Sequence, residues 1–240
     1  MNELLSDIVR AHGGFSRWHA LDRVEATIVT GGNLWAKKGL VQDPNPRRMC
    51  VELHRQGATL TPFGDPDWHT HFSPDRIAIL RSDGEVVAKR NNPRAAFAGH
   101  EMNTTWDALH RAYFNGYALW LYLTTPFLLA REGVRVYEIE PWVEKDETWS
   151  VLRAEFSDTV ATHSPVQDFF FGDDLLLRRH DYHVDIAGGF AAAQLVHDYI
   201  IADGIRLPSK RRAYLRKPNR MPDLDSLMVS IDISDVRFTG

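Results

Sequence analysis

Residues 106–123 read WDALHRAYFNGYALWLYL, and this stretch decides the fold. Its large apolar side chains recur at helical spacing, and very few positions around the helix are polar. Thr104 or Thr105 can cap the helix at its start, and Pro126 stops or kinks it. A helix that is apolar on nearly every side belongs inside a fold, so the rest of the chain has to cover it.

Strand patterns lie on both sides of this helix. Before it, alternating residues predict half-buried strands at 23–30 and 49–55, and Asp83-Gly84 predicts a hairpin over 76–90 with a two-residue turn. After it, turn residues separate further strand signals at 134–142, 149–157, 167–171, 175–186, 206–216 and 227–238. Strands in such a series are typical of an antiparallel meander.

Two other segments complete the prediction. Residues 2–12 have helical spacing and end at two glycines, which predicts a short N-terminal helix. Residues 191–203 fit a short helix by their alanines or a strand by their later apolar residues, and both readings stay open. We therefore predict an α+β protein, mainly antiparallel β, in which a curved sheet wraps around one long apolar helix, plus a short N-terminal helix.

Composition bounds the class of protein. At 240 residues, 44% hydrophobic and 25% charged, the chain is expected to form a single domain over residues 1–240. A net charge of -4 disfavours nucleic acid as a partner. The lone Cys50 excludes an intramolecular disulfide. The N-terminus does not resemble a secretion signal, and residues 113–130 fit a bilayer span poorly, so we expect a cytoplasmic protein without membrane insertion.

Histidines are the first candidates for chemistry. On an extended segment His69, His71 and Asp67 would project from one face and could ligate a metal, but the spacing is common and favours a solvated loop, so we predict no metal. His163 and Gln167 are further polar points beside apolar segments. The signatures of nucleotide-cofactor enzymes, zinc proteases and hydrolase elbows are absent from the sequence, so no cofactor is predicted.

A second constellation lies in LLLRRHDYHVDI, residues 175–186. Strand alternation sends Arg178, His180 and Tyr182 to one inward face. There they would offer a cation, a titratable base and a phenolic donor to one ligand, and they are the candidate catalytic residues. The alternative is that they satisfy one another by hydrogen bonds inside a core.

The aromatic helix supplies the candidate ligand-binding residues, which are Trp106, His110, Tyr113, Tyr117 and Trp120. For His110 the setting on the apolar helix favours a hydrogen-bonded core histidine over a pocket-lining one. The basic residues Lys210, Arg211, Arg212, Arg216 and Lys217 could meet phosphate or carboxylate, but alternation splits them between two faces and favours a solvated strand.

The order of elements carries a resemblance to a known superfamily. The N-terminal helix ends at His12-Gly13-Gly14, with Trp18 and Leu21 following, and residues 203–210 read DGIRLPSK near the end of the meander. This layout resembles the half-barrel superfamily of the LolA and LolB lipoprotein carriers, LppX and VioE. LLRRHDYHVDI, DGIRLPSKRRAYLR and LMVSIDISDVRF also resemble a group of uncharacterised soluble bacterial proteins. The resemblance implies a curved half-barrel sheet around helices and an apolar cavity.

Two functions follow as hypotheses. The chain binds a small apolar or aromatic molecule in a cavity between sheet and helix, with Arg178 and Tyr182 orienting its polar end. Alternatively it is a cofactor-independent lyase, isomerase or cyclase, which the resemblance to VioE suggests, with His180 as general acid or base. Neither the ligand nor the oligomeric state can be read from the residues.

Overall fold

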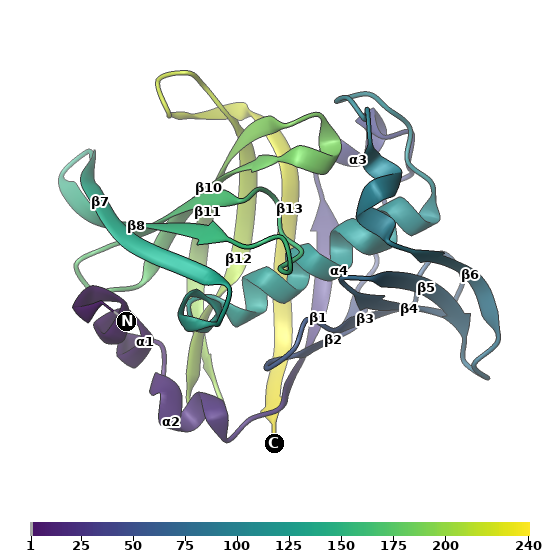
Figure 1. Ribbon diagram of the computed structural model, residues 1–240, viewed down its shortest axis with the longest axis horizontal. Coiled ribbons are helices and arrows are strands. Elements are labelled where there is room, and N and C mark those ends of the chain that lie inside the picture. The colour runs from purple at the N-terminus through teal and green to yellow at the C-terminus, as the bar shows by residue number, and fades with distance from the viewer. Residues whose placement is uncertain (1) are drawn as a thin grey trace.

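The computed structural model describes residues 2–240 and consists of strands with a few helices (Figure 1). The α-helices are α1 (Glu3–Ala11), α2 (Gly14–His19), α3 (Leu34–Lys37) and α4 (Ala108–Thr124). Three short 3₁₀ helices are η1 (Pro93–Phe97), η2 (Phe127–Ala130) and η3 (Asp185–Ala187). The strands are β1 (Arg23–Gly31), β2 (Arg47–Glu52), β3 (Ala58–Thr61), β4 (Trp68–Ser73), β5 (Arg76–Arg81), β6 (Val86–Asn91), β7 (Val134–Glu144), β8 (Glu147–Phe156), β9 (Val166–Phe171), β10 (Leu177–Val184), β11 (Phe190–Ala202), β12 (Ile205–Arg216) and β13 (Pro222–Thr239).

These strands form one open, curved sheet. Its order is β6-β5-β4-β3-β2-β1-β13-β12-β11-β10-β9-β8-β7, and neighbouring strands pair antiparallel. β1 pairs with β13 and so joins the first part of the sheet to the second. The predicted mainly antiparallel β architecture is confirmed, and the open segment 191–203 is a strand, β11.

Helix α4 lies against the concave face of this sheet (Figure 1). Every residue from Ala112 to Thr124 is buried, as the apolar sequence predicts. Its packing partners include strands β2 to β6 on one side. On the other side its tyrosines reach β10. The helix is therefore the centre of the core.

The start of α4 differs from the prediction. Its N-cap is Asp107 rather than Thr104 or Thr105. The Asp107 carboxylate accepts from the His110 amide at 2.8 Å, while His110 Nδ1 accepts from the Asp107 amide at 3.1 Å. This reciprocal capping box uses a histidine at the position that glutamate or glutamine usually holds, which is why the pattern did not stand out in the sequence.

Replacing the cap gives a first testable prediction. Asp107→Ala is expected to lower the free energy of unfolding by about 1 kcal/mol, because the His110 amide at the helix start loses its acceptor. Asp107 also pairs with Arg90 at 2.6 Å, so Asp107→Asn is the control that keeps the cap and removes the charge. Urea denaturation should place the asparagine variant close to the original protein. Equal losses in both variants would assign the effect to the ion pair.

One local prediction is confirmed and another needs correction. α1 ends at Ala11, directly before His12 and Gly13, as the two glycines predict, and Gly13, with a φ of 124° that suits glycine, then caps a second helix, α2. The Asp83-Gly84 hairpin joins β5 to β6 as predicted, but its loop is longer than two residues, since Arg81 N donates to Glu85 O at 2.9 Å. Among residues 2–240, helices long and apolar enough to cross a membrane are absent.

Candidate functional site

The predicted trio on β10 does not stay together. A β-bulge shifts the register between Leu177, which pairs with Phe171, and Arg179, which pairs with Phe170. Arg178 is the additional residue of this bulge, and its guanidinium donates to Asp174 at 2.9 Å near the surface. A bulge breaks the alternation on which the prediction relied. Arg178 is therefore separated from the inward face, whereas His180 and Tyr182 lie on it.

His180 and Tyr182 belong to a buried network beneath α4. The Tyr182 and Tyr122 hydroxyls are 2.9 Å apart, and Tyr122 reaches His163 Nε2 at 2.7 Å. The His163 ring stacks on Tyr182 with centroids 4.0 Å apart. His180 contacts Gln167 Oε1 at 2.7 Å. The network links α4, β9, β10 and the segment that precedes β9.

A buried arginine completes this network. Arg211 of β12 is 1% exposed and donates to Gln194 Oε1 at 2.9 Å and to the Tyr122 carbonyl at 2.8 Å. Its guanidinium also lies over the Tyr122 ring, 4.8 Å from the centroid. Gln194 Nε2 in turn donates to the Tyr182 hydroxyl at 3.3 Å. These partners are neutral, so the charge of Arg211 is stabilised by dipoles and an aromatic face.

An arginine can only donate hydrogen bonds, so it determines which group donates and which accepts along the whole chain of hydrogen bonds. With Gln194 donating to Tyr182, the Tyr182 hydroxyl is free to donate to Tyr122, and Tyr122 then donates to His163 Nε2. A neutral imidazole has one acceptor nitrogen and one N–H. We therefore assign the proton of His163 to Nδ1, which lies 3.2 Å from the Tyr117 hydroxyl.

Burial keeps the titratable groups of this network uncharged. Desolvation lowers the pKa of His163 to about 3 and lowers that of His180 well below its usual value. The same cause raises the pKa of Tyr122 to about 12 and raises that of Tyr182 well above its usual range. A histidine held neutral in this way is a weak base. The arrangement matches the alternative in which these residues satisfy one another inside a core.

The candidate ligand-binding residues of α4 separate in a similar way. Trp106, His110 and Tyr113 pack around Phe97, with ring centroids 4.6 to 5.8 Å apart. Tyr117 is fully buried and faces His163. Trp120 lies near the other end of the helix and lines a pocket.

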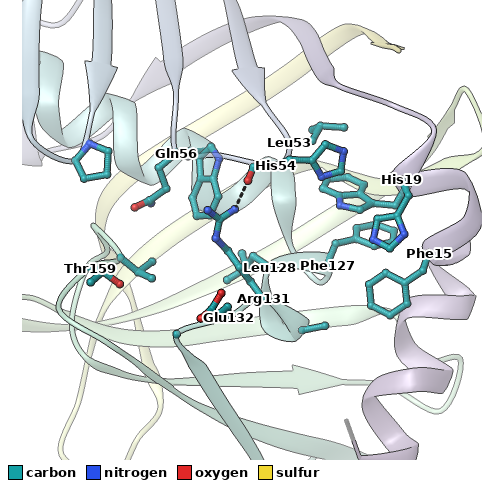
Figure 2. Close-up of a pocket in the computed structure, with 16 residues that line it drawn as sticks. Phe15, His19, Leu53, His54, Gln56, Phe127, Leu128, Arg131, Glu132 and Thr159 are labelled. Carbon is teal, nitrogen blue, oxygen red and sulfur yellow. Dashed lines mark hydrogen bonds between the residues drawn. The ribbon is translucent and has the colours of Figure 1, made fainter.

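This pocket is a cleft of about 690 Å³ beside the C-terminal end of α4. Three segments that are distant in sequence meet there, namely α2, the β2–β3 connection and η2 with the residues that follow it. Its aromatic side is built on Trp18 and Phe127, which stack with ring centroids 4.1 Å apart and an angle of 3° between the rings. Phe15 and His19 stand at the same side (Figure 2).

The opposite side of the pocket is polar. Arg131 lies over the Trp120 ring, with its guanidinium carbon 5.5 Å from the centroid, and donates to the His54 carbonyl at 2.7 Å. Gln56, Glu132 and Thr159 lie on this side in Figure 2. The pocket therefore has an aromatic end and a polar end that includes one arginine. Of its lining, the sequence had singled out Trp120 alone as a ligand-binding residue.

The predicted metal candidates do not converge. His69 and His71 lie on β4 among alternating buried residues, with His71 exposed. Within residues 2–240, groups of three or more histidine, cysteine, aspartate or glutamate residues that could hold a metal ion are absent. Asp67 instead hydrogen-bonds to Ser82.

Comparison with known proteins defines the fold. No family model matches this chain, and no curated protein matches it. A LolA superfamily protein from Nitrosomonas europaea is similar, with a TM-score of 0.54 and 11% identity over 99% of this chain and 92% of that chain. A DUF1329 family protein from Desulfovibrio piger gives a TM-score of 0.53 and 11% identity, covering 98% and 91%.

A third solved structure agrees with these two. It is a domain from Vibrio parahaemolyticus named for outer membrane lipoprotein sorting, with a TM-score of 0.54 and 11% identity over 98% of this chain and 91% of that chain. Such low identity shows the fold alone. The chain has a LolA-like fold, and the resemblance that the sequence suggested is confirmed at that level.

Proposed function

We propose that this protein binds a small apolar or aromatic molecule in the cleft beside Trp120. The observation that carries the proposal is the stacked pair of Trp18 and Phe127 in a pocket of about 690 Å³, a volume typical of small-molecule sites. The two rings stack on each other and are buried, so they form a rigid apolar wall, and the half-buried ring of Phe15 beside them can pack on flat or aliphatic groups and remove their surface from water. The LolA-like fold, which includes a domain named for lipoprotein sorting, is consistent with an apolar ligand.

Arg131 would fix the orientation of the ligand in the cleft. Its guanidinium is partly exposed at the polar side of the cleft, opposite the rings of Phe15 and His19 (Figure 2). Arginine recognises carboxylate and sulfonate groups by charge-assisted hydrogen bonds. The proposed ligand therefore has an apolar or aromatic body and an anionic group. In this proposal the sheet acts as a half-barrel that α4 fills, and the ligand sits at the end of the helix.

The enzymatic alternative draws little support from the trio. His180 is 1% exposed, is held neutral by burial and lies outside the lining of this cleft. Arg178, the cation of the predicted catalytic trio, is paired with Asp174. The likeness to VioE stays a prediction. Binding is the function that the geometry favours.

Anilinonaphthalene sulfonate tests the proposal, because it combines an aromatic body with an anion. We expect saturable binding by fluorescence titration, weakened about tenfold by Phe15→Ala and by Arg131→Gln, since each removes one end of the site. Phe190→Ala is the matched control, because Phe190 is also half-buried but belongs to β11. Equal affinity in all four proteins, or equal loss in the control, would reject this cleft as the binding site.

A further inference from the structure

A second hollow lies on the other face of the sheet. β10 places His180 and Tyr182 toward α4, so strand alternation points Asp181 and His183 away from the helix. A groove of about 600 Å³ opens there, over the ends of β8 to β12. Its charged lining residues are Arg153, Asp168, Asp181, Arg216, Lys217 and Arg220.

Two carboxylates form the floor of this groove. Asp168 and Asp181 are direct partners on the neighbouring strands β9 and β10, and they are 6% and 1% exposed. Like charges opposite each other destabilise a sheet unless cations offset them. Arg153 pairs with both oxygens of Asp168 at 2.7 and 2.9 Å. Arg179 pairs with both oxygens of Asp181 at 2.6 and 2.7 Å.

Further arginines give this cluster more positive charge than the two carboxylates can neutralise. Arg216 contacts Asp181 at 2.8 Å, and Arg220 lies 3.5 Å from Asp168. Four guanidinium groups thus surround two carboxylates, which leaves a net charge of +2. Lys217, which pairs with Asp223 at 3.2 Å, adds an ammonium group at the rim.

The arginines are also held in place. Arg179 is fully buried, and its Nη1 has no hydrogen-bond partner among residues 2–240. The guanidinium groups of Arg179 and Arg220 lie over the Trp142 ring, 5.1 and 4.9 Å from its centroid. Such stacking fixes the planes of the two forks.

We propose that this groove binds a phosphate-type oxyanion, carried either by a small soluble molecule or by a lipid headgroup. Several preoriented guanidinium groups with an excess of positive charge match the charge and geometry of phosphate oxygens. Arg216 is the last residue of β12, and Lys217 and Arg220 lie in the turn that connects β12 to β13, so a bound oxyanion would bridge this segment to Arg153 on β8. The site is on the face opposite α4 and is independent of the cleft that contains Arg131.

The first experimental arm measures pyrophosphate binding by isothermal titration calorimetry at pH 7.5. We expect saturable binding that weakens with added salt. The double variant Lys217→Gln/Arg220→Gln should bind at least about tenfold more weakly. These side chains are 52% and 43% exposed, so the fold should tolerate their replacement, and an unchanged melting temperature verifies this. Arg237→Gln, at an exposed position of β13, is the control and should leave binding unchanged.

The second arm uses vesicles of phosphatidylcholine with and without phosphatidylglycerol in a sedimentation assay. Binding to pyrophosphate that only the double variant loses supports a soluble phosphate compound. Sedimentation with phosphatidylglycerol alone, lost in the same variant, supports a lipid headgroup. The proposal is overturned if neither probe binds, or if the double variant and Arg237→Gln behave alike.

Discussion

The free energy of unfolding is expected to fall by about 3 kcal/mol as the pH drops from 6.5 to 5, because two buried histidines stay neutral in the folded state. Burial lowers the pKa of His163 to about 3 and that of His12 to about 4. Each unfolded imidazole binds a proton near pH 6.5, whereas the folded one does not. Their contribution to stability is complete above pH 6.5 and is lost as the pH falls toward 4 and 3.

The magnitude follows from linkage. Each group contributes about 1.4 kcal/mol per pH unit well between its two pKa values, and half of that at pH 6.5, where the unfolded imidazole is half protonated. The two together therefore contribute at most about 2.7 kcal/mol per unit. His180, whose pKa is also lowered by burial, acts in the same direction. Carboxylates with lowered pKa values, such as Asp107, weaken the fold only below about pH 4.5. The window from pH 6.5 to 5 therefore reports mainly on the histidines.

His163→Phe isolates one of these histidines. The phenyl ring can keep the stacking on Tyr182 but cannot bind a proton, so the loss of stability per pH unit should fall by about 1.4 kcal/mol. At pH 7 the variant is less stable, because Tyr122 and Tyr117 lose a partner. Urea denaturation at several pH values, followed by tryptophan fluorescence, measures both effects. His71→Gln, at an exposed position of β4, is the control, and an equal change of slope there would contradict the assignment.

Much of the fold could be predicted because its signals are periodic. The apolar residues of α4 and the alternation in β1 follow directly from burial on one or both faces. Where a local irregularity interrupts the period, the prediction was wrong. The bulge at Arg178 moves one residue out of register, so the trio predicted to face inward on β10 loses its first member.

The candidate site was harder to predict for a different reason. Trp18 lies more than one hundred residues before Phe127 and Arg131, and each of the three looks ordinary in its own segment. Likewise, Arg211 stands in a basic run that suggests a solvated strand, yet β12 turns it inward under α4. Which segments come together in space depends on the long-range pairing of β-strands, and a single sequence contains little information on that pairing.

Gly116 is the position where the smallest change should have the largest effect on packing. A Cβ atom built there would lie 2.3 Å from Phe72 Cγ and 2.5 Å from Phe72 Cβ, on the strand β4 that α4 contacts. Those atoms are at the base of the side chain, so a change of rotamer cannot move both away. Gly116→Ala should destabilise the protein by about 1 to 2 kcal/mol although alanine favours helix, and Gly116→Val by about 3 kcal/mol.

A double-mutant cycle with Phe72→Leu decides whether this close approach is the cause. Phe72→Leu alone is destabilising, because it removes volume from a fully buried position. If the Cβ at position 116 acts through Phe72, the smaller leucine relieves part of the clash, and the double variant loses at least about 1 kcal/mol less than the sum of the single losses. Additive losses, measured by urea denaturation, would mean instead that the glycine is needed for the helix backbone itself. The cycle therefore tests whether α4 can approach β4 closely only because position 116 has no side chain. The closed core depends on this contact.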